Sequence, residues 1–201
     1  MKVIEQSYQI LSIAYNTLYQ IERAGRTCYK SEEKISEGSE IHFAKMLRDS
    51  GHHAMLEFGD IAVRFITNRG VTHELVRHRL CSFAQESTRY VKYDGQMEFI
   101  LPVWWNEVDE ESQAIWMEAM KESEQNYRIL RRKGWRPEQA REVLPNSLKT
   151  EIVVKANTRE WRHIFQLRCS SKAHPQMRAL MRPLHRDIKG VIPIIYDDIK
   201  Y

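Results

Sequence analysis

The chain has 201 residues and a net charge of +4, from 31 Lys and Arg against 27 Asp and Glu. Hydrophobic residues make up 42% and aromatic residues 10%, with only eight Gly and six Pro, which excludes a disordered, fibrous or low-complexity chain. No uncharged apolar run reaches the ~18 residues of a membrane helix, and Glu5 interrupts the start where a secretion signal would be apolar.

Hydrophobic periodicity and capping residues predict a mixture of strands and helices. Ser39 is expected to cap one helix that Gly51 ends, and acids at the start and bases at the end mark the clearest helix, 109–133. In chain order we expect a strand at 3–10, a helix at 16–24 and the helix after Ser39. A strand at 60–67, a turn at 68–70 and a helix opening at Thr72 are expected next, followed by a strand at 97–101 and the helix at 109–133. The last expected elements are a short helix from Pro137 to about 144, a strand at 149–156, and helices at 158–168 and 175–189. The prediction is a single α+β domain over residues 1–201, with a mainly antiparallel sheet packed with helices.

Several common sites are missing from the sequence. The glycines never lie closer than eight residues apart, so neither GxGxxG nor GxxxxGK[ST] occurs, and GxSxG and HExxH are absent too. We therefore expect no metal ion, and any nucleotide must be held without a glycine loop. The three cysteines, Cys28, Cys81 and Cys169, form no disulfide framework, which favours a reducing, cytoplasmic setting without a membrane partner.

Charge is unevenly distributed along the chain. Residues 161–186 contain six Lys and Arg and no acid, whereas residues 106–124 contain seven acids and one Lys. Arginine pairs bidentately with phosphate and carboxylate, so the basic stretch indicates an anionic ligand. The alternatives are a solvated helix face or a nucleic-acid-binding module without catalysis.

The densest polar segment runs from Arg77 to Tyr90. Three arginines, a histidine, two serines, a glutamine and a glutamate fall within these fourteen residues. Ser87 and Arg89 are two residues apart, so in extended backbone a hydroxyl and a guanidinium point the same way and suit a phosphate. A plain solvated loop is the alternative.

Arg77-His78-Arg79, seven residues and then Ser87 form an RHRx7S pattern, and in this the chain resembles the flavin-dependent thymidylate synthases. The resemblance spans about residues 20–180 and includes Gly51-His52…Glu57, Ala140 to Pro145, Asn157-Thr-Arg159 and Leu167-Arg168. It implies reductive methylation of dUMP to dTMP. The implied carbon donor is 5,10-methylenetetrahydrofolate, the hydride carrier is FAD reduced by NADPH, and the products include tetrahydrofolate. It also implies a homotetramer with active sites shared between subunits, and no nucleic-acid partner.

The same resemblance implies roles for individual residues. The FAD contacts it implies are His52, Arg77, His78, Arg79, Gln85, Asn157, Arg159 and His163. The dUMP contacts it implies are Glu74, Arg77, Gln85, Glu86, Ser87, Thr88, Arg89, Arg141 and Arg168, with Ser87, Arg89 and Arg141 on the phosphate.

Arg168 is the implied catalytic residue, because a fixed cation beside uracil N3 favours its deprotonated form. No protein nucleophile is implied, so we interpret Cys81 as a packing residue, although a neighbouring cation could activate a thiol. Glu74 departs from the family pattern, and its alternative role is to pair with a motif arginine. Another flavoprotein with an unrelated substrate is a third interpretation of the chain.

Overall fold

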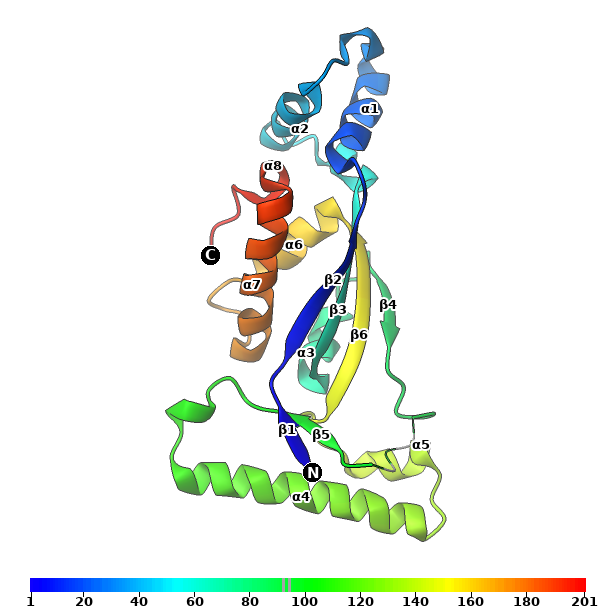
Figure 1. The fold of residues 1–201 in the computed structure, drawn as a ribbon, viewed down its shortest axis with the longest axis vertical. Coiled ribbons are helices and arrows are strands. Elements are labelled where there is room, and N and C mark those ends of the chain that lie inside the picture. Colours follow the sequence, from blue (N-terminus) through cyan, green and yellow to red (C-terminus); the bar gives the residue numbers. More distant parts are fainter. Residues whose placement is uncertain (92, 94) are drawn as a thin grey trace. The chain divides into compact units, whose positions relative to one another are not determined.

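The computed structural model describes residues 1–91, 93 and 95–201 (Figure 1). Contacts within the chain divide it into two compact units. The first unit comprises Met1–Ser7, Phe65–Arg77 and Ala84–Ile152, and the second comprises Tyr8–Arg64, His78–Phe83 and Val153–Tyr201. The chain therefore passes between the units five times, and four of these crossings fall inside β-strands.

A four-stranded sheet has the order β2-β3-β6-β4, with β2 at Ser7–Ile13, β3 at Asp60–Asn68, β6 at Lys149–Asn157 and β4 at Ser82–Gln85. The end of β2 meets the start of β3, where Ala14 N–H donates to Asp60 O at 2.9 Å, so these strands are antiparallel. Buried residues alternate along β3 and β6, as expected for strands with one face against a core. The α+β class and the antiparallel sheet predicted from the sequence are confirmed.

The first unit also contains a parallel pair of short strands, β1 (Lys2–Ile4) and β5 (Glu98–Ile100). Its helices are α3 (Arg69–Leu75), α4 (Glu110–Arg132) and α5 (Pro137–Ala140), with 3-10 helices at Trp105–Glu107 and Arg141–Val143. Its buried cluster gathers apolar side chains from β5, α4, α5 and the residues that precede β5 and β6, namely Met97, Phe99, Met120, Tyr127, Ala140 and Leu148. Asp109 caps α4 by accepting from Ser112 N–H at 2.8 Å.

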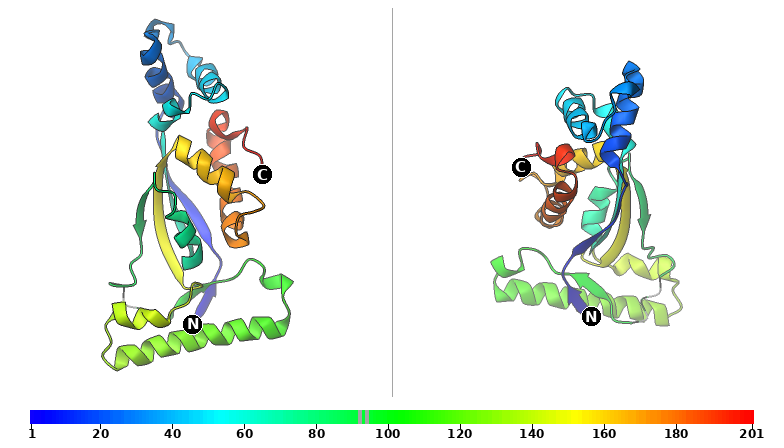
Figure 2. Two further views of the ribbon diagram at one scale, coloured as in Figure 1. Left: turned by 180° about the vertical axis from the view of Figure 1, so that it is seen from behind. Right: turned by 45° about the horizontal axis from the view of Figure 1, so that its top comes forward.

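The second unit contains α1 (Thr17–Tyr29), α2 (Ser39–Asp49), α6 (Thr158–Arg168), α7 (Pro175–Val191) and α8 (Pro193–Tyr196), with 3-10 helices at Glu32–Lys34 and His53–Phe58. α1 and α2 lie side by side, and α6 packs on α7 (Figure 2). Trp161 and Phe165 of α6 are fully buried, and Trp161 Nε1–H donates to Ile61 O at 3.0 Å. A Cβ at Gly59 would lie 2.4 Å from Thr17 Cγ2, so only glycine fits there.

Several element boundaries differ from the sequence predictions. The strand expected at 3–10 is two strands, because β1 pairs with β5 whereas β2 joins the larger sheet. Ser39 is not an N-cap but the first residue of α2, after Gly38 in left-handed backbone, and its hydroxyl donates to Glu22 instead. The turn expected at 68–70 is the start of α3, since Asn68 caps that helix by accepting from Val71 N–H at 2.9 Å.

Other elements were longer than expected or not predicted. α1 continues to Tyr29 instead of ending near 24. β4 and α8 were missed because each has only four residues, which is too short to show a periodicity. Among the described residues, the helices include none that is both long and apolar enough to span a membrane.

Candidate active site

The RHRx7S segment belongs to both units. Arg77 ends one stretch of the first unit, His78–Phe83 belongs to the second, and the chain from Ala84 returns to the first. The residues implied for FAD and dUMP therefore form two groups, one in each unit, and each group has its own geometry.

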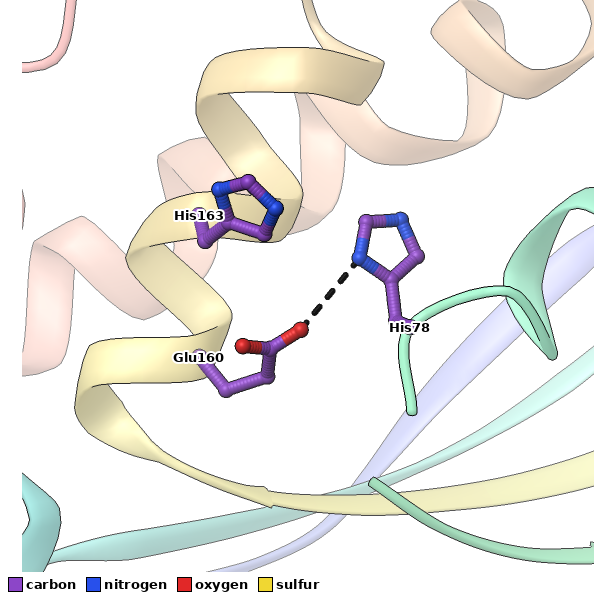
Figure 3. A group of neighbouring side chains, drawn as sticks. All are labelled: His78, Glu160 and His163. Atoms are coloured by element: carbon purple, nitrogen blue, oxygen red, sulfur yellow. Dashed lines mark ion pairs between the residues drawn. The ribbon is translucent and has the colours of Figure 1, made fainter. Parts of the chain in front are cut away.

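In the second unit, His78 connects two charged side chains of α6. Its Nδ1 lies 3.3 Å from Glu160 Oε1 (Figure 3). Its Nε2 accepts from Arg168 Nε–H at 3.0 Å. His78 and Glu160 are buried. Burial, together with the charges of Arg168 and His163, lowers the pKa of His78 to about 4, so the ring is neutral at pH 7. The structure thus brings together His78, implied for FAD, and Arg168, implied for dUMP.

A pocket of about 410 Å³ lies over the start of α6 in this unit. It contains three of the residues implied for FAD, and its lining is His53, Glu57, Leu80, Asn157, Arg159, Glu160, Arg162, His163 and Gln166. Arg159 Nη1 pairs with Glu57 Oε1 at 2.7 Å at the exposed rim. Guanidinium and imidazole donors beside an apolar residue suit a ligand that has both anionic groups and an aromatic ring.

Asn157 has a structural task within this pocket. Its Oδ1 caps α6 by accepting from Glu160 N–H at 2.8 Å. The Asn at this position therefore both starts the helix that carries Arg159, His163 and Arg168 and borders the pocket.

The other three residues implied for FAD in this unit, His52, His78 and Arg79, lie outside the pocket lining. His52 is exposed and precedes the 3-10 helix His53–Phe58, and Arg79 is exposed immediately after His78. Sequence reasoning selected His52, whereas it is the neighbouring His53 that borders the pocket, with its Nε2 3.1 Å from Arg48 O.

The side chains of His78, Glu160 and His163 also come close enough to hold a metal ion, with one ligand atom from each within 4.8 Å of the others. His78 Nε2 is occupied by the Arg168 donor, so only Nδ1 faces this cluster. The fixed positive charge of Arg168 disfavours a cation next to His78. The geometry fits a hydrogen-bonded chain better than a metal centre.

Cys81 follows His78 by three residues, and its N–H donates to His78 O at 3.1 Å. Burial and the charge of Glu160 raise the pKa of the Cys81 thiol to about 12. A thiolate is the nucleophilic form of cysteine, so these surroundings oppose a nucleophilic role and agree with the interpretation of Cys81 as a packing residue.

In the first unit, the loop after β4 is anchored to β6 and α3. Gln85 Nε2–H donates to Thr72 Oγ1 at 3.0 Å and to Thr150 Oγ1 at 3.3 Å. Glu86 N–H donates to Glu151 O at 2.9 Å. The anchors Thr72 and Thr150 were not found from the sequence, because a threonine on a buried strand or helix face carries no motif.

Glu86 does not project freely from this loop. Its carboxylate pairs with Lys149 Nζ at 3.2 Å and accepts from Tyr93 OH at 3.1 Å. Lys149 also pairs with Glu151 at 2.6 Å. Glu86 therefore fixes the loop at its start, a role that the sequence did not reveal.

The rest of the loop carries the groups implied for a phosphate. Ser87 Oγ accepts from Arg89 N–H at 3.2 Å, and Arg141 Nη1–H donates to the buried Thr88 Oγ1 at 3.2 Å. Arg89 is exposed, with its guanidinium 5.4 Å from the ring centre of Tyr90. The structure thus brings the Arg141 guanidinium to the loop at Thr88, whose neighbours in the chain are Ser87 and Arg89. A guanidinium in this position suits an anion.

Glu74 and Arg77 lie at the end of α3. Glu74 is half-buried and Arg77 is exposed, and the Arg77 N–H donates to Glu74 O at 3.3 Å. This backbone hydrogen bond closes the C-terminal end of α3.

The acid-free stretch 161–186 does not form an open basic face. Arg162 is buried and pairs with Asp198 at 2.6 Å, and Arg168 donates to His78. Arg178 and Arg182 donate to backbone carbonyls, at Ser171 and Cys169. Since most of these cations contact protein groups, the stretch is a poor platform for a nucleic acid.

The family model described as "Thymidylate synthase complementing protein" matches residues 10–194. A flavin-dependent thymidylate synthase of Geobacter sulfurreducens is 35% identical over 183 residues, covering 87% of this chain and 78% of the relative. One of Mycobacterium tuberculosis is 33% identical over 198 residues, covering 90% and 78%. The fold is shared with a UMP/dUMP methylase, PolB of Streptomyces cacaoi, solved with 5-Br dUMP, at a TM-score of 0.83 and 20% identity, covering 98% of this chain and 96% of that one.

The match covers both groups of residues, since both the loop Gln85–Arg89 and α6 lie within residues 10–194. It confirms the resemblance inferred from the RHRx7S pattern and makes the chain a member of a family of enzymes. The chain belongs to the flavin-dependent thymidylate synthase family.

Proposed function

We propose that this chain methylates dUMP to dTMP, taking the carbon from 5,10-methylenetetrahydrofolate and the hydride from FAD reduced by NADPH. The observation that carries the proposal is the contact of Arg168 with the motif residue His78, in a chain that matches the family over residues 10–194. The Streptomyces methylase of the same fold, solved with 5-Br dUMP, supports dUMP as the substrate class.

The second unit offers a donor set that fits FAD. Arg159 and His163 border its pocket, and Asn157 caps the helix that carries both of them. We assign His78, Asn157, Arg159 and His163 to the flavin in this unit, with His52, Arg77, Arg79 and Gln85 as further proposed contacts. When bound, FAD supplies hydride-transfer chemistry, which no side chain of the protein can supply.

The loop of the first unit offers groups that fit the dUMP phosphate. Ser87 contributes a hydroxyl, and Arg89 and Arg141 contribute guanidinium groups, which bind phosphate oxygens bidentately. Gln85, Glu86 and Thr88 shape this loop through their contacts with Thr72, Lys149 and Arg141. Glu74 and Arg77 are proposed contacts of the same nucleotide.

Arg168 is the proposed catalytic residue. Its permanent positive charge, placed beside uracil N3, favours loss of the N3 proton and stabilises the negative charge that develops toward C5. No protein thiol takes part in this proposal, which agrees with the raised pKa of Cys81. The chain's own contribution is therefore to bind both ligands, orient them and stabilise charge.

The proposal includes a homotetramer in which subunits share active sites. A chain of 201 residues has little room to enclose FAD, dUMP and a folate by itself. Large apolar side chains, among them Ile115, Tyr15 and Leu80, are exposed and therefore available for subunit contacts. The single-domain organisation over residues 1–201 stays a prediction.

The test uses the purified full chain. Its visible spectrum is recorded with FAD and then with dUMP, and dTMP is measured after adding methylenetetrahydrofolate and NADPH. We expect bound flavin, a spectral change on adding dUMP, and dTMP formation. Flavin binding without dTMP would indicate a flavoprotein with another substrate, and absence of flavin binding would contradict the proposal as a whole.

A further inference from the structure

His78, which lies outside α6, contacts side chains from both ends of that helix. Glu160 lies in the first turn of α6 and Arg168 is its last residue, about 12 Å away along the axis. His78 contacts both, Glu160 through Nδ1 at 3.3 Å and Arg168 through Nε2 at 3.0 Å. The imidazole therefore bridges the two side chains.

Only one protonation state of His78 satisfies both contacts. Nε2 accepts from the Arg168 guanidinium, which has no acceptor atom, so Nε2 carries no proton. A neutral ring must then carry its proton on Nδ1, the atom that faces Glu160 Oε1 (Figure 3). A doubly protonated ring would set an N–H against the Arg168 N–H, and the lowered pKa of His78 agrees with its exclusion at pH 7.

We propose that Glu160 is a positioning residue that holds His78 as the neutral Nδ1–H tautomer, so that the Nε2 lone pair of the ring directs the Arg168 side chain. A carboxylate commonly fixes the tautomer of a functional histidine in this way. An arginine without such an acceptor occupies several rotamers, and holding it beforehand avoids the loss of side-chain entropy when substrate binds. The consequence for catalysis rests on the proposed function, in which Arg168 is catalytic.

Glu160 suits this role because the cap of α6 does not use its carboxylate. Its carboxylate is buried, and its backbone N–H, not its side chain, takes part in the cap with Asn157. Burial raises the pKa of Glu160, and the charges of His163 and Arg159 offset this rise only in part.

The first test observes the tautomer and needs no activity. The ring nitrogens of His78 are followed by NMR in the full chain with 15N-labelled histidine, assigned by the loss of signals in His78→Gln. At pH 7 we expect a protonated Nδ1 and an unprotonated Nε2. A protonated Nε2 in the unsubstituted protein would overturn the proposal.

Two variants of Glu160 separate the effect of losing its hydrogen-bond acceptor from the effect of changing the size of its side chain. Glu160→Leu removes the acceptor, and we expect His78 to lose its preference for Nδ1–H. Glu160→Gln keeps an oxygen acceptor without charge, so we expect the tautomer to remain and the Nδ1–H proton resonance to move. If Glu160→Leu does not fold, the glutamine variant decides, because an unmoved resonance would contradict the contact.

The second test measures turnover. Glu160→Leu is expected to lower kcat about tenfold, with the KM for dUMP changed less than about twofold, because the Arg168 charge acts most strongly in the transition state. Glu160→Gln should recover most of the rate. Asp60→Asn is the matched control, since it neutralises a carboxylate that pairs with Lys155 at the surface. Unchanged kcat in folded Glu160→Leu would overturn the proposal.

Addition of Zn²⁺ distinguishes the hydrogen-bonded chain from a metal site at the same residues. We expect no change in the His78 ring signals, and a shift at stoichiometric Zn²⁺ would overturn the proposal in favour of a cation site. If the unsubstituted protein makes no dTMP, the proposed function fails, whereas the NMR measurement still decides the relation of Glu160, His78 and Arg168.

Discussion

The arginine-bearing groups of the two units differ in what their cations contact. On α6 of the second unit, Arg162 is buried and paired with Asp198, and Arg168 donates to the buried His78. In the first unit, Arg89 of the loop is exposed, and Arg141 of the 3-10 helix Arg141–Val143 donates to the hydroxyl of Thr88. We expect substitutions on α6 to alter geometry and stability along with chemistry, and substitutions of Ser87 and Arg89 in the loop to alter ligand binding alone.

The largest expected effect is that of Arg168→Ala. It removes the proposed charge stabilisation at uracil N3 and should lower kcat by about 10²–10³-fold, the range for loss of one preorganised donor in a transition state. Flavin binding should persist, since Arg168 does not line the pocket of the second unit. Arg186→Ala, an exposed arginine on α7, is the control. Full dTMP formation by Arg168→Ala would contradict the assignment.

Asp198→Asn tests the buried side of the comparison. Arg162 Nη1 and Nη2 contact the Asp198 carboxylate at 2.6 and 2.7 Å, and Arg162 is only 5% exposed. Loss of this partner should lower the free energy of unfolding by about 2 kcal/mol, less than for a fully buried pair because Asp198 is partly in water. The measurement is urea unfolding, with Asp187→Asn as the control on the exposed Tyr8 contact.

The same pair predicts a pH dependence. The hydrogen bond from Arg162 lowers the pKa of Asp198 below its usual value, so the folded state releases this proton more readily than the unfolded state. The stabilisation is complete above the ordinary carboxyl pKa of about 4 and is lost as the pH falls below it. Asp198→Asn should show a weaker decline of stability in this acid range, and an equal decline in both proteins would count against the pair.

The motif segment and α6 show how much of the candidate site could be predicted from the sequence. The RHRx7S spacing identified the family, and α6 begins and ends at the residues that its cap and charges predict, Thr158 and Arg168. The contact of His78 with Glu160 joins residues 82 positions apart, and the anchoring of Glu86 by Lys149 joins residues 63 apart. Such contacts depend on which strands and helices become neighbours, and local periodicity does not contain that information.

Ser87→Ala tests the exposed side of the comparison. Loss of one hydroxyl on the phosphate should raise the KM for dUMP about tenfold, a typical cost for a hydrogen bond to a charged group, with kcat nearly unchanged. Stability should hardly change, because among the described residues Ser87 Oγ is contacted by the Arg89 N–H, a local partner two residues on. Ser82→Ala, exposed on β4, is the control. A large loss of stability would show that the loop is structural as well.

The smallest expected effect is that of removing a helix cap, either Asn157 on α6 or Asn68 on α3. Replacing either by Ala should lower the free energy of unfolding by about 1 kcal/mol, measured by urea titration. Asn157→Asp keeps the oxygen that caps α6, so it should restore stability relative to Asn157→Ala. If the amide of Asn157 also donates to FAD, as proposed, Asp will not restore flavin affinity, because a carboxylate lacks the amide N–H. Recovery of both properties in Asn157→Asp would mean that Asn157 serves the helix and not the flavin.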